Sequence, residues 1–219
     1  MKLITRFSKL RNRNGGFQGS KDYWIKRYEG GSNSGGGSYG VLAEYKSEVL
    51  NDFVRDNNIN SIIEYGCGDG NNLSFFNFPS YLGLDVSDFV ILNNKKRFQK
   101  NNNWAFMSID DNGEFSFIAD LTLSLDVIYH LVEDEVYEHY MTSLFKSSAK
   151  FVVIYSSNVD FNPAAAHVRH REFTKWIEFN RPDFELYRML NNPHKSELLG
   201  DNPNKSFANF FIYKSRLHK

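Results

Sequence analysis

From Ser61 onward, short runs of apolar and β-branched residues alternate with stretches that carry apolar residues at helical spacing. We predict strands at 61–65, 81–85, 104–109, 121–126 and 151–156. The stretches between them predict helices at 87–99 and 133–145. Strands and helices that alternate in this way are typical of βαβ units and a mainly parallel sheet.

Three further segments extend this pattern. Residues 41–57 carry apolar side chains at helical spacing and predict a helix that leads into the first strand, and a shorter helix follows at 173–180. The last apolar runs, 184–190 and 207–213, flank a segment with two prolines and a glycine, which predicts a long loop. We therefore expect one α/β domain whose seven-stranded, mainly parallel sheet is flanked by helices and has an antiparallel pair at one edge.

The first forty residues have a different pattern. Residues 1–13 place Leu3, Phe7 and Leu10 on one helical face among five basic residues, which predicts a basic amphipathic helix. That helix either packs on the domain or contacts a membrane surface or partner. The Gly/Ser-rich segment 30–40 is either a linker or a lid, and we favour a lid because too few residues precede it to form a domain. We divide the chain into this N-terminal region, 1–40, and a main domain, 41–219.

Composition and charge exclude several classes of protein. The 26 basic and 26 acidic residues cancel, so no net field attracts nucleic acid. No apolar run approaches the roughly 20 residues of a membrane-spanning helix, so we expect no stable membrane insertion. Cys67 is the only cysteine, which excludes an internal disulfide framework and agrees with a cytoplasmic protein.

The chemistry concentrates in the segment SIIEYGCGDG, residues 61–70. A strand with an acidic residue, Glu64, near its end is followed by glycines at positions 66, 68 and 70. Glycines in such a turn permit a close approach of the backbone to a ligand. The second predicted strand ends in Asp85, where a carboxylate can accept hydrogen bonds from both ribose hydroxyls of a nucleoside. A plain turn would explain the glycines alone, but the combination predicts a nucleoside cofactor site.

The glycine spacing selects among cofactors. The dinucleotide fingerprint is G-x-G-x-x-G, whereas this chain has G-x-G-x-G. The segment resembles motif I of class I S-adenosylmethionine-dependent methyltransferases, which implies a Rossmann-like fold and S-adenosylmethionine as cofactor. The resemblance assigns the ribose to Asp85, the adenine to Asp110 or Asp111 and the methyl-transfer site to the end of the fourth strand. Cofactor-binding residues are then expected to be Tyr28, Glu64, Gly66, Cys67, Gly68, Gly70, Asp85, Val86, Ser87, Asp110 and Asp126.

Other segments resemble one group within that family. They are the D-Y-W-x-x-R-Y segment at 22–28 with the Gly-rich loop after it, and LSLDVIYHLVEDE at 123–135, together with 155–158 and HVRHREF at 167–173. This group is found with bacterial capsule and surface-polysaccharide biosynthesis, and includes the methylation of a capsular phosphoramidate. The resemblance covers about 21–213. It implies O-methylation of a small anionic precursor, phosphorylated or phosphoramidate; a sugar hydroxyl of a glycan or nucleotide-sugar is the alternative.

Two residues after the fourth predicted strand are catalytic candidates. His130 has an unperturbed pKa near 6.5, which suits a general base, and Asp126 lies at the strand end. The alternative is a histidine bonded to backbone and an aspartate that caps the next turn. Acceptor binding is expected from a cationic cluster, which could also be a solvated turn, and from two tyrosines. These acceptor residues are Tyr39, Tyr129, His167, Arg169, His170 and Arg171.

The remaining candidates have structural alternatives. Cys67 lies inside the loop and is expected to pack, because no histidine marks it as a nucleophile. Trp24, Tyr28 and Tyr39 either close over the cofactor or anchor the N-terminal helix. We expect no metal, because no carboxylate has a ligand-like spacing to the histidines. The rival classes are a nicotinamide-dependent oxidoreductase and a non-catalytic scaffold that keeps the cofactor fold.

Overall fold

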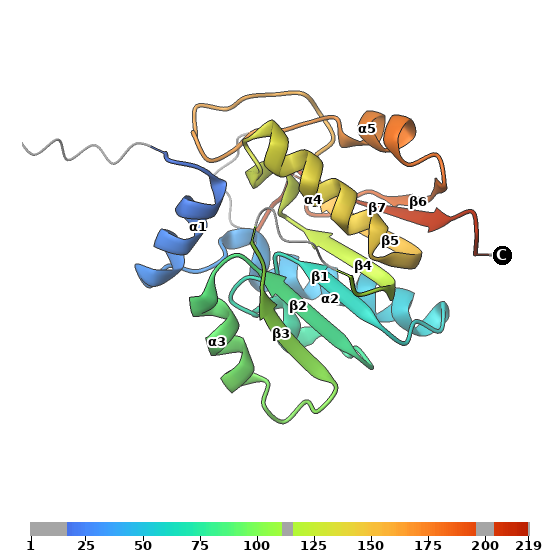
Figure 1. Ribbon diagram of the computed structural model, residues 1–219, viewed down its shortest axis with the longest axis horizontal. Coiled ribbons are helices and arrows are strands. Elements are labelled where there is room, and N and C mark those ends of the chain that lie inside the picture. The colour runs from blue at the N-terminus through green and yellow to red at the C-terminus, as the bar shows by residue number, and fades with distance from the viewer. Residues whose placement is uncertain (1–16, 111–115, 196–203, 219) are drawn as a thin grey trace, which may run out of the picture.

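The computed structural model describes residues 17–110, 116–195 and 204–218, so the predicted helix at 1–13 lies outside the described residues. Within these ranges the centre of the protein is a seven-stranded sheet with the order β3-β2-β1-β4-β5-β7-β6 (Figure 1). Strands β1 to β5 are parallel, and β7 is antiparallel to both β5 and β6. The strands are Ile62–Tyr65, Tyr81–Asp85, Trp104–Ser108, Ala119–Leu125, Ser148–Ser156, Phe184–Leu190 and Asn209–Ser215.

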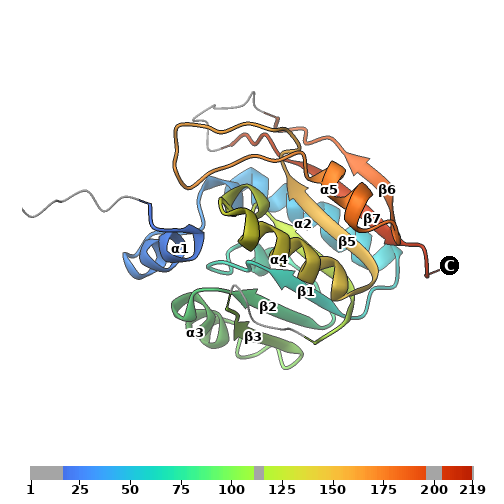
Figure 2. The ribbon, with the colours of Figure 1, turned by 45° about the horizontal axis from the view of Figure 1, so that its top comes forward.

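Helices cover both faces of the sheet (Figure 2). Helices α2 and α3 contribute to the apolar cluster on one face, and α4 and α5 to the cluster on the other. The α-helices, in order, are Ser20–Glu29, Gly40–Asp56, Asp88–Arg97, Asp134–Lys146 and Phe173–Asn180. Single turns of 3-10 helix form η1, η2 and η3 at Gly36–Ser38, Asn72–Phe75 and Ile128–His130. The structure therefore has three layers with the sheet in the middle.

The central strands are buried on both faces, which explains their nearly continuous apolar sequences. In β5, Phe151, Val153 and Tyr155 belong to the cluster beneath α2, whereas Val152 and Ile154 belong to the cluster beneath α4. This alternation is the period of two that a strand imposes on its side chains. The apolar pattern of the sequence thus fixes both the strand and the two layers that cover it.

The predicted fold class is confirmed, including the antiparallel pair β6–β7 at one edge. The strand and helix ranges agree to within a few residues. The largest difference is at β5, which begins at Ser148 and not at Phe151. The three additional residues have mixed polarity and no strand pattern, but Ser148 pairs with Ala119 of β4. Helix α1 was not assigned bounds from the sequence, because its exposed polar positions obscure the helical spacing. No helix among the described residues has the length and apolar character that a membrane crossing needs.

We predict that Leu123→Ala in β4 lowers the free energy of unfolding by about 2–5 kcal/mol, because the side chain is completely buried and its loss leaves a cavity. Leu92→Ala in α3 is the matched control, since that leucine is 57% exposed and its loss should change stability by about 0.5 kcal/mol or less. Urea denaturation measures both. Equal losses for the two variants would contradict the two-sided burial of β4.

Candidate active site

A cleft lies where the carboxyl ends of β1, β2 and β4 meet, which is the usual ligand edge of an open parallel sheet. The loop after β1 and the segment between β4 and α4 form its floor and one wall. Helix α1 and residues from the segment 34–38 form the opposite wall. Its polar lining includes Ser20, Lys21, Ser34, Glu64, Asp69, Asn71, Asn72, Asp85, Asp110, Asp126, His130, His139 and Tyr140.

The three glycines of the loop after β1 adopt a backbone conformation that favours glycine, with positive φ at Gly66 (82°), Gly68 (56°) and Gly70 (74°). Their missing side chains leave room for other parts of the protein. A Cβ at these positions would collide with Val127, Ser34 and Asn94, respectively. The glycines therefore let three separate elements pack against the loop, in addition to shaping the cleft.

Asp85 is the best-placed group for a ribose. It lines the cleft at the end of β2, where its carboxylate accepts the backbone N–H groups of Gly68 at 2.9 Å and Ser87 at 3.0 Å. Burial raises the pKa of Asp85 to about 6, although these hydrogen bonds favour the ionised form. Each carboxylate oxygen accepts one backbone N–H and keeps a lone pair for a ligand hydroxyl. Asp85 is thus fixed in position and mainly ionised at neutral pH.

Glu64, in the neighbouring strand β1, also lines the cleft. The Tyr81 hydroxyl donates a 2.5 Å hydrogen bond to Glu64 Oε2, and the carboxyl group is 2% exposed. Burial raises its pKa to about 7, partly opposed by this hydrogen bond and by the charge of Lys46. Next to it, burial raises the pKa of the Cys67 thiol well above its usual value, so the thiol is a packing group at neutral pH.

Asp126 is held in an unusual backbone conformation by a buried cation. Its φ is 61°, in the left-handed region that a residue with a side chain rarely adopts. Lys46 Nζ lies 2.6 Å from Asp126 Oδ2, and the Lys46 side chain is completely buried. The Tyr129 hydroxyl donates to Asp126 Oδ1 at 2.9 Å. The carboxylate thus receives a partner at each oxygen, and this pair supports the strained residue.

His130 lies at the end of η3 beside α1. Its ring meets the Trp24 ring edge-on, with centroids 4.8 Å apart, and its Nδ1 lies 3.1 Å from the carbonyl oxygen of His167. Since a carbonyl only accepts, Nδ1 carries the hydrogen and Nε2 keeps a lone pair. Burial lowers the pKa of His130 to about 4, opposed in part by this hydrogen bond. His130 is a neutral proton acceptor at physiological pH.

The Gly/Ser-rich segment is anchored to the loop after β1 by Asp69. Asp69 Oδ2 accepts the backbone N–H of Ser34 and the hydroxyl of Tyr39, both at 2.8 Å. Ser34 Oγ is in turn 3.0 Å from the Tyr28 hydroxyl and accepts the Asp69 backbone N–H. Burial and the bond to Asp69 raise the pKa of Tyr39 to about 12. Tyr39 therefore fastens this segment, and it does not line the cleft as an acceptor-binding residue.

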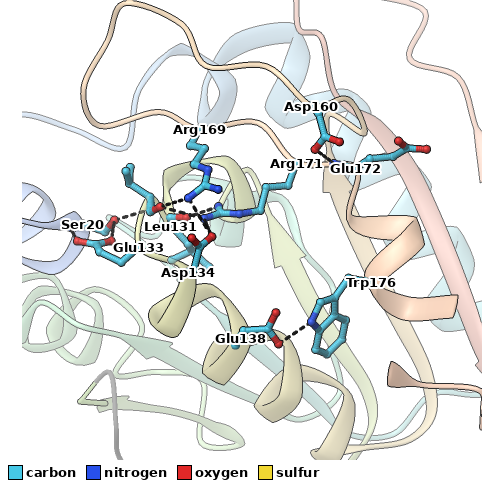
Figure 3. A network of polar contacts seen from close by, with 11 residues as sticks. Ser20, Leu131, Glu133, Asp134, Glu138, Asp160, Arg169, Arg171, Glu172 and Trp176 are labelled. Carbon is cyan, nitrogen blue, oxygen red and sulfur yellow. Dashed lines mark hydrogen bonds and ion pairs between the residues drawn. The ribbon is translucent and has the colours of Figure 1, made fainter. Parts of the chain in front are cut away.

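The arginines of the predicted cationic cluster contact the turn between β4 and α4 and do not line the cleft. Arg169 and Arg171 both reach Asp134 Oδ1, at 2.9 and 3.0 Å, and both donate to the carbonyl of Val132 (Figure 3). Arg171 additionally donates to the carbonyl of Leu131. The two guanidinium groups hold the turn 131–134 and do not line the cleft, so this geometry gives no support to their expected role as direct acceptor contacts.

The same turn fastens the start of α1. Glu133 accepts both the backbone N–H and the hydroxyl of Ser20, at 2.8 and 2.5 Å, and Ser20 Oγ accepts the N–H of Val132 (Figure 3). Two other acceptor candidates in this region, His170 and Tyr129, are buried and do not line the cleft. His170 Nδ1 lies 2.6 Å from Ser157 Oγ, and Tyr129 is engaged by Asp126.

Most cofactor-binding expectations fall in the cleft, together with both catalytic candidates. The predicted residues that line it are Tyr28, Glu64, Gly66, Cys67, Gly68, Asp85, Val86, Asp110, Asp126 and His130. Gly70 and Ser87 do not line it, because Gly70 packs against Asn94 and Ser87 is completely buried. Sequence reasoning missed Asp69, although it lies within the glycine-rich motif, and it missed Asn72 and Tyr140, which belong to no motif. It also missed Lys46, which supports the site from α2. No group of His, Cys, Asp or Glu within the described ranges is arranged to hold a metal ion.

Several solved structures with a similar fold are methyltransferases. Magnesium protoporphyrin IX methyltransferase from Synechocystis PCC 6803 with bound S-adenosylhomocysteine superposes with a TM-score of 0.63 at 12% identity, over 89% of this chain and 97% of that one. The N-methyltransferase NodS from Bradyrhizobium japonicum WM9, also in complex with S-adenosylhomocysteine, superposes with a TM-score of 0.62 at 14% identity, over 80% of this chain and 87% of that one. The methyltransferase domain of bacterial CtHen1-C superposes with a TM-score of 0.59 at 18% identity, over 78% of this chain and 96% of that one. No family model and no curated protein matches the sequence.

These similarities show that the chain has the Rossmann-like fold of S-adenosylmethionine-dependent methyltransferases. The cleft fits that cofactor chemically. Its lining carries five carboxyl groups, of which Asp126 is paired with Lys46 and Asp110 with Lys21. Asp69 and Asp85 complement the sulfonium and ammonium charges of S-adenosylmethionine, and Ile109 and Val86 offer an apolar surface to the adenine. The buried Asn72 Oδ1 in the lining has no hydrogen-bond partner among the described residues and can accept one from a ligand.

We predict that Asp85→Asn weakens binding of S-adenosylhomocysteine about 10-fold or more, because a neutral amide replaces a charged acceptor of two ribose hydroxyls. With a pKa of about 6, wild-type Asp85 is protonated as the pH falls, so wild-type affinity should decrease below pH 6 and level off above it. Calorimetric titration between pH 5 and 8 measures both effects. Glu64→Gln is the control, and its affinity for S-adenosylhomocysteine should still decrease below about pH 6. If the affinity of Asp85→Asn showed the same pH dependence, that dependence would belong to another group.

We predict that Lys46→Met lowers the free energy of unfolding by about 3–5 kcal/mol, because it leaves the Asp126 carboxylate, 12% exposed, without its cation. The double variant Lys46→Met/Asp126→Asn should recover much of this loss, since no charge is then left unpaired. Urea denaturation of the single and double variants measures the coupling. Additive losses would show that the two residues act independently.

Proposed function

We propose that the protein is an S-adenosylmethionine-dependent O-methyltransferase that acts on a small acceptor. The observation that carries the proposal is the cleft itself, which is lined by Asp85 at the end of β2 and by a neutral histidine, His130, at the end of η3. Asp85 would bind the ribose and Asp110 the adenine side. The acidic lining would hold the amino acid part beside the loop after β1.

The cofactor supplies the methyl group as a sulfonium, and the protein positions the acceptor oxygen and removes its proton. His130 provides the proton acceptor through Nε2, because Nδ1 is engaged by the carbonyl of His167. With a pKa of about 4, His130 is too weak a base to deprotonate an alcohol in advance. The proton therefore moves as the new oxygen–carbon bond forms and the alcohol becomes acidic. Asp126, paired with Lys46, lies nearby, and its carboxylate partly offsets the fall in the pKa of His130.

For the acceptor we propose a small precursor of a bacterial capsule or surface polysaccharide, on the basis of the similarity at 22–28 and 123–135. A hydroxyl of a sugar or nucleotide-sugar is favoured by the presence of a neutral proton acceptor. An already ionised phosphate or phosphoramidate oxygen is the second candidate, and it would need positioning but no base. That candidate loses the support of Arg169 and Arg171, which are paired with Asp134. We also propose a cytoplasmic location and a lid role for α1 with the segment 30–40.

We predict that His130→Ala lowers kcat at least about 100-fold for a hydroxyl acceptor and leaves S-adenosylhomocysteine affinity within a few-fold. His194→Ala is the matched control, because His194 packs on Tyr45 and does not line the cleft. A methyl-transfer screen over sugars, nucleotide-sugars, sugar phosphates and phosphoramidates, read by mass spectrometry, identifies the acceptor. Full activity of His130→Ala would favour the ionised acceptor, and failure of the wild type to bind S-adenosylhomocysteine would contradict the proposed function.

A further inference from the structure

Helix α1 separates the cleft from a second hollow. One side of the helix, with Lys21, Trp24 and Tyr28, lines the cleft. The other side lines the second hollow, whose far wall is formed by Ala166 and His167 of the segment between β5 and α5. The charged and titratable side chains of this hollow are Asp22, Tyr23, Lys26, Arg27 and His167.

Arg27 is the notable charge in this hollow. Three other partly or fully buried arginines, Arg169, Arg171 and Arg181, each form an ion pair with an aspartate. Arg27 is also partly buried, yet among residues 17–110, 116–195 and 204–218 it forms no ion pair. Its Nε donates to the carbonyl of Asn33 at 2.8 Å, and Nη1 reaches the Tyr23 hydroxyl at 3.4 Å.

The acid of the hollow does not neutralise Arg27. Asp22 Oδ2 is paired with Lys26 Nζ at 2.7 Å on the same side of α1. That pair cancels, so the hollow keeps the positive charge of Arg27. Across from it, the His167 ring is stacked on the Tyr23 ring, with centroids 4.2 Å apart and planes 10° apart, which fixes the imidazole as a further potential hydrogen-bonding group.

We infer that this second hollow binds an oxyanion carried by the acceptor, a phosphate or a carboxylate group, through Arg27 and His167. A guanidinium group with unused N–H donors matches such an anion in charge and shape. The inference rests on the proposed methyl transfer and adds to it the class of acceptor. It assigns the anion to Arg27 in place of the arginines after β5.

The hollow and the cleft are adjacent where His167, which lines the hollow, contacts His130, which lines the cleft. The rings of His167 and His130 are parallel, with centroids 5.8 Å apart. In the inferred complex, an acceptor with its anion at Arg27 extends past His167 and presents a hydroxyl to His130. Burial lowers the pKa of His167, and the positive charge of Arg27 lowers it further. The same two causes, burial first, contribute to the low pKa of His130. A bound anion offsets this charge and makes His130 a better base when the acceptor is present.

The test measures anion binding without requiring turnover. Inorganic phosphate is titrated into the protein at constant ionic strength and pH 7.5, with and without S-adenosylhomocysteine, and the ring resonances of the six histidines are followed by NMR. The inference expects saturable shifts at His167 and His130. Arg27→Gln should weaken phosphate binding about 10-fold or more, and Arg27→Lys should restore part of it. Acetate in a parallel titration distinguishes a carboxylate from a phosphate site.

Two variants control the experiment. Arg188→Gln removes an exposed arginine on β6 and should leave phosphate binding unchanged. Arg169→Gln tests the cluster after β5 and should also leave it unchanged. Unaltered binding in Arg27→Gln, or loss of binding only in Arg169→Gln, would overturn the inference. Titration of each variant with S-adenosylhomocysteine is independent of these outcomes, so failure of the cofactor proposal is recognised separately.

Discussion

The carboxylate of Asp126 is the point on which the arrangement of the cleft depends. It joins α2, through Lys46, to the end of β4, and it accepts the hydroxyl of Tyr129 from η3. The segment before α2 also packs on it, since a side chain at Gly37 would come within 3.0 Å of Asp126 Oδ2. A single ion pair, sheltered from water, thus sets the relative positions of the sheet edge, the helix that precedes β1 and the segment that covers the cleft.

Much of the fold could be predicted from the sequence because the central strands are buried on both faces and have nearly continuous apolar runs. The loop after β1 and Asp85 could be recognised because their residue types are required locally, at a fixed spacing from a strand end. Lys46 could not, because a lysine in an amphipathic helix has the pattern of an exposed residue. Its burial follows only from the tertiary contact with Asp126, 80 positions later.

The contacts of the arginines after β5 could not be predicted for the opposite reason. A dense cationic cluster in the sequence suggested a ligand of opposite charge, but the opposite charge is Asp134, 35 positions before Arg169. The two arginines also donate hydrogen bonds to the backbone carbonyls of residues 131 and 132. No sequence pattern predicts such contacts with backbone. Arg27 appeared only as part of a motif, and its lack of an acidic partner among the described residues becomes visible once α1 lies against the segment that carries His167.

The loop after β1 has a consequence for how this sequence can change during evolution. Its three glycines face three independent neighbours: Val127 after β4, Ser34 in the covering segment and Asn94 in α3. A larger residue at any one position needs a compensating change in a different element, and the three compensations are unrelated to one another. Single substitutions in this loop are therefore expected to be tolerated least in a library of variants. Ser34 and Asn94 are constrained as well, because each forms a hydrogen bond with the loop backbone.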